Sequence, residues 1–273
     1  MRPPNVKLAA AVLFASALLS GNLAAAEALK VGGTGSATEM MRQVGAKFTA
    51  ASEVPIEVVP SLGSAGGIHA LADRLLDIAV SARPLKAAEA ANGLTQVAVL
   101  RTAFVLATTH TGARGLKAGD LAKIFAADKP TWPDGTPLRI VLRPRSETDN
   151  DLLGKMAAGM VEAIESARKR PEVPVAATDQ DNADLAERTP DTMISTTLTQ
   201  LTTENRKLLL TVPLDGVEPT LANFESGAYS FAKNLYFIIR TNSSPATQRF
   251  VEFLKSPQGV AALRATATLP GAQ

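Results

Sequence analysis

Residues 28–48 read ALKVGGTGSATEMMRQVGAKF and combine three local patterns. An apolar, β-prone run at 28–31 is followed by a glycine-rich segment at 32–36. Apolar side chains then recur at the spacing of one helix face: Met40, Met41, Val44 and Phe48. The stretch therefore predicts a strand that enters a helix through a tight turn.

The same order of strand, loop and helix repeats downstream. PIEVVP at 55–60 predicts a second strand, a loop rich in glycine and serine covers 61–67, and a helix with an apolar stripe follows. A short buried strand at 77–80 then opens into SARP at 81–84. Strands that alternate with helices at these lengths predict an α/β fold with a largely parallel sheet.

Two longer β-rich runs, at 96–109 and 234–240, lie far apart in the chain. The region between them has its own predicted helices and strands: helices at 116–127, 149–168 and 196–204, and strands at 138–142 and 207–212. After the second run only helical patterns follow. We therefore expect two lobes joined by a hinge of two crossing strands, with 27–104 and 237–273 in lobe 1 and 105–236 in lobe 2.

The first 26 residues have the pattern of a secretory signal peptide. Arg2 and Lys7 supply a basic start, residues 8–19 form an uncharged apolar run, and three alanines at 24–26 precede Glu27. The apolar run is shorter than the roughly 20 residues that a membrane-spanning helix needs. We expect an exported, periplasmic protein whose mature chain starts at Glu27.

Charge and cysteine content exclude several classes of protein. The chain has 28 Lys and Arg against 26 Asp and Glu, too little excess for binding nucleic acid through its net charge. The absence of cysteine excludes disulfides, thiolate nucleophiles and cysteine-ligated metals. Asn22 follows Leu19-Ser20-Gly21, where a lipid-anchored export signal has cysteine, so we expect no lipid anchor. Because both excess positives lie within residues 1–26, the mature chain has 28 − 2 = 26 basic and 26 acidic residues.

Hydroxyl side chains follow the predicted strands, together with glycines and arginines. The candidates are Ser36 and Thr38, Ser64, Ser81, and Arg143, Arg145, Ser146 and Thr148. In an open α/β sheet, ligands bind outside the carboxyl ends of the strands, and turns that enter helices expose backbone N–H groups. Such donors suit a small oxyanion, with an arginine as charged partner. Each residue also has an ordinary role as turn glycine, helix cap or solvated charge, so the repetition at four strand ends carries the hypothesis.

The motifs of common enzyme classes are absent from the sequence. Leu62 stands two places before Ser64, so there is no nucleophile elbow, and no phosphate loop or dinucleotide fingerprint occurs. For His69 and His110 we expect structural roles at the surface, since their placement favours neither a general base nor a metal ligand. We expect no catalytic residue, cofactor or metal site.

Several segments together resemble the periplasmic phosphate-binding proteins of ABC transporters. The matching segments are GTGSAT at 33–38, GSAGG at 63–67, DIAVSARPL at 77–85, LAKIF at 121–125 with Trp132, Arg143 with Ser146 and Thr148, GVEPT at 216–220, SGAY at 226–229, Leu235-Tyr236 and FVEFLKSPQ at 250–258. These segments occur in order through nearly the whole chain after residue 26.

The resemblance implies a type II periplasmic-binding-protein fold, with two α/β lobes that close on a ligand between them. The residues that it assigns to the ligand are Ser36, Thr38, Ser64, Ser81, Arg143, Ser146 and Thr148, with Thr34, Arg83 and Arg145 as further candidates. Arg145 is the alternative to Arg143, because the spacing there is offset by one residue. The implied partners are phosphate or a similar oxyanion and an inner-membrane ABC transporter permease, and the implied state is a monomer.

One position departs from the family pattern. Ala82 stands where some members have an Asp that accepts the proton of hydrogen phosphate and thereby rejects sulfate. Glu147 or Asp149 can take over this role, and another oxyanion, an organic phosphate or a phosphonate stays an alternative ligand. MISTT at 193–197 also replaces a glycine-rich turn of the family. A sensor or interaction protein that keeps the fold without transport is the alternative function.

Overall fold

The computed structural model describes residues 27–113 and 115–271, and the expected signal peptide at 1–26 lies outside them. The first elements alternate between strand and helix, as the sequence predicts. They are β1 (Leu29–Gly33), a 3-10 turn (Gly35–Ala37), α1 (Thr38–Ser52), β2 (Ile56–Val59), α2 (Gly63–Ala72), β3 (Ile78–Ser81) and α3 (Ala87–Ala91). Strand β1 pairs in parallel with both β2 and β3.

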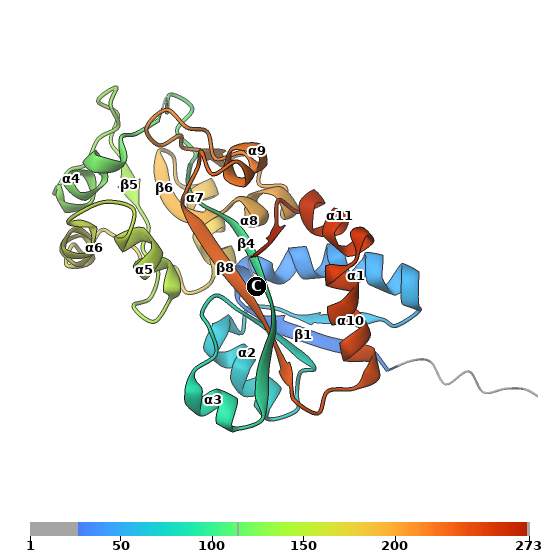
Figure 1. Ribbon diagram of the computed structural model, residues 1–273. Helices are drawn as coiled ribbons and strands as arrows, with labels where there is room; N and C mark the ends of the chain where they lie inside the picture. The colour runs from blue at the N-terminus through green and yellow to red at the C-terminus, as the bar shows by residue number, and fades with distance from the viewer. Residues whose placement is uncertain (1–26, 114, 272–273) are drawn as a thin grey trace, which may run out of the picture.

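Two long strands cross the middle of the molecule. Strand β4 (Leu94–Thr108) pairs antiparallel with β8 (Ala232–Arg240), from Leu94 opposite Arg240 to Ala103 opposite Ala232. The strand order of the sheet is β2-β1-β3-β8-β4-β6-β5, so β8 and β4 connect its two halves. Figure 1 shows them running from the half that carries α1 and α10 into the half that carries α4 and α6.

The chain between these strands builds the second half of the molecule. Its elements are a 3-10 turn (Ala118–Asp120), α4 (Leu121–Ala126), β5 (Arg139–Ile140), α5 (Thr148–Gly154), α6 (Met160–Arg168), α7 (Asp179–Arg188), β6 (Thr192–Thr197), α8 (Leu198–Thr203), β7 (Leu210–Thr211) and α9 (Leu221–Glu225). After β8 follow α10 (Pro245–Lys255), α11 (Pro257–Ala265) and β9 (Leu269–Pro270). The α/β fold class predicted from the sequence is confirmed, but the expectation of a largely parallel sheet is wrong. The sheet is mixed, because β8 pairs antiparallel with β3 and β4, and β4 pairs antiparallel with β6.

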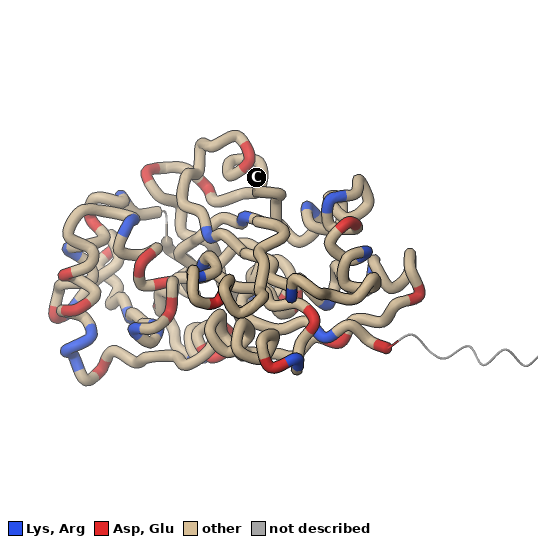
Figure 2. The backbone as a smooth tube through the Cα atoms, turned by 60° about the horizontal axis from the view of Figure 1, so that its bottom comes forward, with Lys and Arg blue, Asp and Glu red and all other residues tan. Residues whose placement is uncertain are grey.

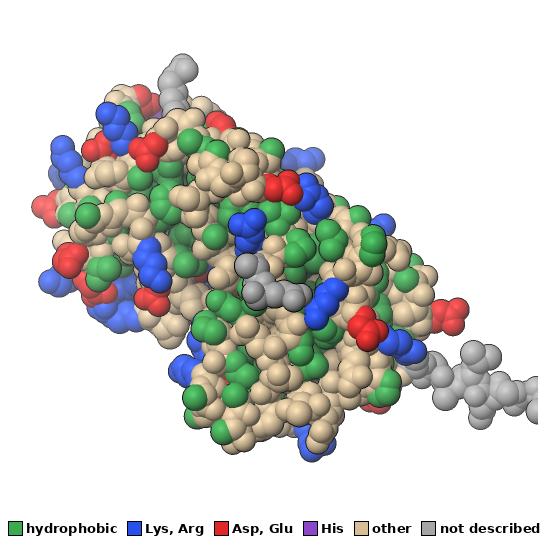
Figure 3. Space-filling view, in the orientation of Figure 1, with side chains coloured by type: hydrophobic (Ala, Val, Ile, Leu, Met, Phe, Trp, Pro, Cys, Tyr) green, Lys and Arg blue, Asp and Glu red, His purple; other side chains and the backbone are tan. Residues whose placement is uncertain are grey.

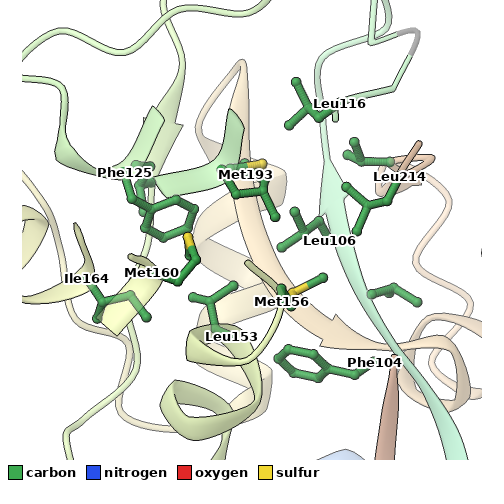
Figure 4. Packing of buried hydrophobic residues seen from close by; sticks show 14 of the residues in the cluster. Phe104, Leu106, Leu116, Phe125, Leu153, Met156, Met160, Ile164, Met193 and Leu214 are labelled. Atoms are coloured by element: carbon green, nitrogen blue, oxygen red, sulfur yellow. The ribbon is translucent and has the colours of Figure 1, made fainter. Parts of the chain in front are cut away.

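Each half of the sheet is covered by helices on both faces. In the first half, α1, α10 and α11 pack on one face through residues such as Phe48 and Phe250, and α2 covers the other face through Ile68 and Leu71. In the second half, a separate cluster gathers apolar residues of β4, β6 and α4 to α6, as Figure 4 shows. Separate cores on either side of β4 and β8 give each half its own packing.

The structure corrects several element boundaries. Helix α2 starts at Gly63, inside the predicted loop, and the predicted helix at 149–168 is broken into α5 and α6 at Gly159, whose φ is 77°. Helix α7 and strand β6 were not predicted. The segment MISTT at 193–197, which stands where the family has a glycine-rich turn, lies in β6, where all residues are buried between β4 and β5. The short strand β9 follows helices where only helical patterns were expected.

Charged residues of both signs are spread over the molecule. Figure 2 shows Lys and Arg interspersed with Asp and Glu over both halves, and the face in Figure 3 mixes both signs with apolar side chains. None of the helices within residues 27–113 and 115–271 has the length and apolar composition needed to cross a membrane. An anion would therefore be held by local donors rather than by a broad positive field.

Candidate functional site

The loop after β1 owes its shape to Gly33, which has a φ of 140°. A Cβ atom at this position would lie 1.9 Å from the Val80 carbonyl oxygen, so only glycine fits. The Thr34 N–H donates to the same carbonyl at 2.8 Å, and the chain then turns through 35–37 into α1. Thr34, Ser36 and Thr38 are all buried at this helix start. The loop thus holds three buried hydroxyl side chains at the start of α1, and its Ser36 N–H faces the second half of the molecule.

The backbone of Ser36 is bound by a carboxylate from the other half. The Ser36 N–H donates to Asp179 Oδ2 at 3.0 Å, while the Ser36 hydroxyl lies 3.3 Å from that of Thr34. Asp179 is the first residue of α7. The next residue is Gln180, and its side-chain amide Nε2 donates to the Gly35 carbonyl at 3.1 Å. The loop after β1 and the start of α7 therefore form one contact across the two halves.

Arg143 lies on the second side of this contact and is only 3% exposed. Its Nη1 donates to the Ala176 carbonyl at 2.7 Å, and its Nη2 lies 3.8 Å from both Asp179 Oδ2 and Glu147 Oε2. The Arg143 Nε is buried and has no hydrogen-bond partner among the described residues. A guanidinium with free donor capacity thus points at the place where the Ser36 N–H binds a carboxylate oxygen.

A buried lysine completes the charged groups at the site. Lys233 of β8 is 2% exposed, and its Nζ lies 2.5 Å from Asp149 Oδ1 and 4.0 Å from Asp179 Oδ1. Burial lowers the pKa of Lys233, but Asp149 and Asp179 raise it above its ordinary value, so the lysine stays protonated. Asp149 Oδ2 is buried without a partner among the described residues.

We call Arg143, Glu147, Asp149, Asp179 and Lys233 the interlobe cluster. Its two cations face three carboxylates, so full ionisation gives a net charge of +2 − 3 = −1. Burial raises the pKa of Glu147, although the nearby Arg143 opposes the shift. The cluster therefore favours either a protonated Glu147 or a ligand that brings a proton of its own.

A small cavity of about 130 Å³ lies beside the cluster. It is lined by Arg143, Glu147 and Asp179 on one side and by Gly35 and the 61–63 loop on the other. Pockets for organic ligands start near about 300 Å³, so this volume suits a small inorganic ion. Near this cavity an oxyanion would meet the Arg143 guanidinium, the Ser36 N–H that Asp179 now occupies, and carboxylates that accept protons.

Three of the predicted ligand residues make local bonds instead: Ser64 in the first turn of α2, Ser81 at the end of β3 and Arg83 just after it. The Ser64 hydroxyl accepts from the Ala82 N–H at 2.9 Å, and the Ser81 hydroxyl donates to the Arg83 carbonyl at 2.7 Å. Arg83 forms a bidentate pair with Glu89, which holds the pKa of that carboxyl at about 2. These bonds tie the loops after β2 and β3 to each other, and they place the Arg83 guanidinium on Glu89 rather than on the cluster.

The predicted residues after β5 separate into buried and exposed positions. Arg145 is exposed and pairs with Glu165, whereas Arg143 is buried in the cluster. Ser146 is exposed, and Thr148 is the partly buried first residue of α5. Neither hydroxyl hydrogen-bonds another described residue. Of the two candidate arginines, Arg143 is therefore the one that the structure brings to Ser36.

A family model described as the PBP superfamily domain matches residues 20–258. The chain belongs to the PBP superfamily. No curated protein sequence matches it. Similar solved structures include a phosphate ABC transporter substrate-binding protein from Clostridium perfringens with bound phosphate, at 17% identity and a TM-score of 0.74, over 90% of this chain and 100% of that one.

Two further structures share this PBP fold. An ABC-type phosphate transport receptor from Vibrio cholerae is 17% identical with a TM-score of 0.59, over 88% of this chain and 99% of that one. A periplasmic molybdate-binding protein from Azotobacter vinelandii is 14% identical with a TM-score of 0.59, over 89% of this chain and 100% of that one. At these identities the likeness establishes the fold, and different oxyanions are bound on it.

The two histidines of this PBP-superfamily chain differ in environment. His69 is exposed, but the expectation of a surface position for His110 is wrong. His110 is 8% exposed, stacks on Trp132 and contacts Asp191 through Nδ1 (2.8 Å) and Asp134 through Nε2 (2.9 Å). Burial lowers its pKa, but these two carboxylates raise it above the ordinary value. The ring bridges two loops of the second half.

Sequence reasoning missed Asp179, Gln180 and Lys233. A signal for the first two was present, because Thr178 and Asp181 form a capping box at the start of α7. Lys233 was the one charged residue in the mostly apolar run at 231–239, which is unusual for a strand that crosses the middle of a sheet.

Proposed function

We propose that this chain is an extracytoplasmic solute-binding protein that captures a small oxyanion, phosphate first, and delivers it to an ABC transporter in the inner membrane. One observation carries the proposal: the Asp179 carboxylate, itself an oxyanion, lies on the Ser36 N–H and beside Arg143. Ser36 and Arg143 are both candidates from the sequence. The phosphate-bound Clostridium perfringens structure of the same fold supports this ligand class.

The ligand site lies between two lobes, 27–104 with 237–273 and 105–236, which the strands β4 and β8 connect. Several hydrogen bonds cross between them in this conformation. The Gln43 amide donates to the Thr203 carbonyl at 3.1 Å, and the Ser61 hydroxyl donates to Gln180 Oε1 at 3.2 Å. A ligand shifts the equilibrium from the open to the closed state only by the difference between its binding free energies for the two states.

Glu147 and Asp179 supply the proton acceptors that Ala82 cannot. Both carboxylates lie 3.8 Å from Arg143 and line the small cavity. Hydrogen phosphate offers a proton to such an acceptor, whereas sulfate has none at neutral pH and meets an unpaired carboxylate. The net negative cluster therefore favours phosphate over fully ionised oxyanions.

The export route and the absence of catalysis belong to the same proposal. Residues 1–26 direct the chain to the periplasm and are removed without attachment of a lipid. The mature chain acts as a monomer that binds its ligand without chemical change. Neutral hydroxyls and backbone N–H groups at the loop after β1 provide binding without a nucleophile activated by a base.

Calorimetric titration of the mature protein with phosphate and sulfate at neutral pH tests the ligand. We expect phosphate to bind at least tenfold more tightly than sulfate, since one repulsive or unsatisfied carboxylate contact costs about 1.4 kcal/mol or more. Repeating the phosphate titration in buffers of different ionisation enthalpy reports protons taken up by Glu147. Tight sulfate binding without a phosphate response would refute the phosphate assignment.

Asp179→Asn removes the negative charge that holds the Ser36 N–H. We expect this variant to bind sulfate about tenfold more tightly and to lose most of the preference for phosphate, because the repulsive carboxylate is gone. Asp73→Asn, at an exposed position after α2, is the matched control and leaves both affinities unchanged. An Asp179→Asn variant with an unaltered ratio of phosphate to sulfate affinity would remove Asp179 from the site.

A further inference from the structure

The segment TLTQ at 197–200 begins helix α8 and has the sequence pattern of a capping box. The Thr197 hydroxyl accepts from the Gln200 N–H at 3.1 Å, which is the first bond of that motif. In a complete capping box the fourth side chain reaches back to the N–H of the first residue. The Gln200 amide is directed to helix α7 instead, so this side chain has a different role.

Both ends of the Gln200 amide are bound, and the residue is only 1% exposed. Its Nε2 donates to the Asp179 carbonyl at 3.1 Å and to Glu204 Oε2 at 3.3 Å, and its Oε1 accepts from the Thr196 hydroxyl at 2.8 Å. A buried amide whose donor and acceptor are both paired is held rigidly. Gln200 therefore fixes the backbone of the residue whose carboxylate accepts from the Ser36 N–H.

Helix α8 also holds the second residue of α7. Glu204 lies at the end of α8, and its Oε1 accepts from Gln180 Nε2 at 2.7 Å. The same Nε2 donates to the Gly35 carbonyl, and Gln180 Oε1 accepts from the Ser61 hydroxyl. The first turn of α7 is thus held from α8 at two successive residues, Asp179 and Gln180.

The opposite side of α8 is bound to lobe 1. Thr199 is fully buried, its N–H donates to the Thr102 hydroxyl at 3.2 Å, and its own hydroxyl donates to the Ala267 carbonyl at 3.2 Å and lies 2.8 Å from that of Thr268. All three partners belong to lobe 1, although the sequence places α8 in lobe 2. Figure 1 shows α8 between α7 and the C-terminal helix α11. Helix α8 therefore connects lobe 1 to the start of α7.

This connection bears on how the interlobe site distinguishes anions. Repulsion of an anion that has no proton requires a carboxylate in a fixed place, because a carboxylate that can turn away no longer opposes it. Gln200 does not line the small cavity, so it acts on a ligand only through Asp179. Being neutral, it holds the Asp179 carbonyl without changing the charge of the interlobe cluster.

We propose that Gln200 is a positioning residue that holds Asp179 in place and thereby sets the preference for phosphate over sulfate, with Thr199 as its anchor on lobe 1. This role rests on the proposed function, since it concerns the selectivity of the interlobe site. Loss of the Gln200 amide leaves every group of the interlobe cluster present but frees the first turn of α7.

Hydrogen exchange of the Ser36 amide, followed by NMR on the ligand-free mature protein, tests the positioning of Asp179. Gln200→Met keeps the length of the side chain and removes its amide, so we expect the Ser36 amide to exchange at least about threefold faster. The Thr34 amide donates to the Val80 carbonyl within lobe 1 and keeps its rate as an internal reference. An unchanged Ser36 rate, or equal acceleration of both amides, would overturn the positioning role.

Calorimetric titration with phosphate and sulfate measures the selectivity. For Gln200→Met we expect the ratio of phosphate to sulfate affinity to fall about threefold to tenfold. In the Asp179→Asn background the same replacement changes the ratio less than about twofold, because the two residues act as one unit. Equal effects in both backgrounds would refute action through Asp179. A wild-type chain that binds neither anion would refute the proposed function, while Ser36 exchange would still decide whether Gln200 positions Asp179.

Asn182→Leu is the matched control on the same helix. Asn182 is 1% exposed, and its amide donates to the Ser195 carbonyl at 2.8 Å, so the variant removes a buried bond of the same kind that does not involve Asp179. We expect the Ser36 exchange rate and the affinity ratio to stay as in the wild type. If Asn182→Leu changes both as much as Gln200→Met does, any loosening of α7 suffices and the specific role of Gln200 is refuted.

Thr199→Val tests the anchor and provides a milder variant should Gln200→Met not fold. It keeps the side-chain shape and removes the hydroxyl that binds the Ala267 carbonyl. We expect faster Ser36 exchange and a lower affinity ratio, each by a smaller factor than in Gln200→Met. Wild-type values for both in a folded Thr199→Val protein would contradict the anchoring of α8 through this residue.

Discussion

Lys233→Met is expected to lower the free energy of unfolding by about 3–5 kcal/mol, because removing one member of a buried ion pair leaves the other charge uncompensated. The Lys233 ammonium lies 2.5 Å from Asp149 Oδ1 and is also near Asp179. Asp149 already has one buried oxygen without a partner. Methionine fills a similar volume but donates no hydrogen bond. Urea denaturation followed by circular dichroism measures the difference.

Two further variants separate this charge effect from loss of packing. Lys47→Met, at an exposed position of α1, is expected to change stability by less than about 0.5 kcal/mol. The double variant Lys233→Met with Asp149→Leu is expected to regain much of the lost stability, since an apolar pair replaces the buried ions. If Lys233→Met alone costs under about 1 kcal/mol, the buried pair of Lys233 and Asp149 does not stabilise the fold.

The sequence predicted those parts of the site that follow a strand directly. Gly33 and Ser36 lie at the end of β1 and Arg143 lies just after β5, and strand patterns with turn chemistry place such residues at the carboxyl ends of the strands in each half. The sequence could not predict that Arg143 is buried and Arg145 is exposed, because both residues follow the same strand. That difference depends on tertiary contacts, because Arg143 binds the Ala176 carbonyl whereas Arg145 pairs with Glu165 at the surface.

The missed elements had weak local signals. Helix α7 buries mainly Asn182, Ala183 and Ala186, so its apolar stripe is small and its sequence is mostly polar. Strand β6 contains three threonines and is buried on both faces, so it lacks the alternation that marks a half-exposed strand. The partners of Asp179 and Lys233 depend on contacts across the two halves, which no periodicity in the sequence describes.

Arg143→Ala is expected to weaken phosphate binding by about 2–5 kcal/mol, or from about 30-fold to several thousandfold. The guanidinium provides the one arginine of the interlobe cluster, and without it a single cation faces three carboxylates, for a net charge of +1 − 3 = −2. Such a cavity repels an anion as well as lacking a donor. Calorimetry with phosphate measures the change, and circular dichroism checks the fold, since Arg143 also binds the Ala176 carbonyl.

Ser36→Ala and Arg145→Ala provide the comparison. Ser36→Ala removes only the hydroxyl and keeps the backbone N–H, which donates to Asp179 in this structure. We therefore expect phosphate affinity to fall about tenfold or less. Arg145 is exposed and paired with Glu165, so its replacement leaves phosphate affinity unchanged. Arg143→Lys keeps the charge without the planar fork and gives an intermediate affinity. Equal losses for Arg143→Ala and Ser36→Ala would assign the charged partner of the anion to another residue, with Arg83 released from Glu89 as the next candidate.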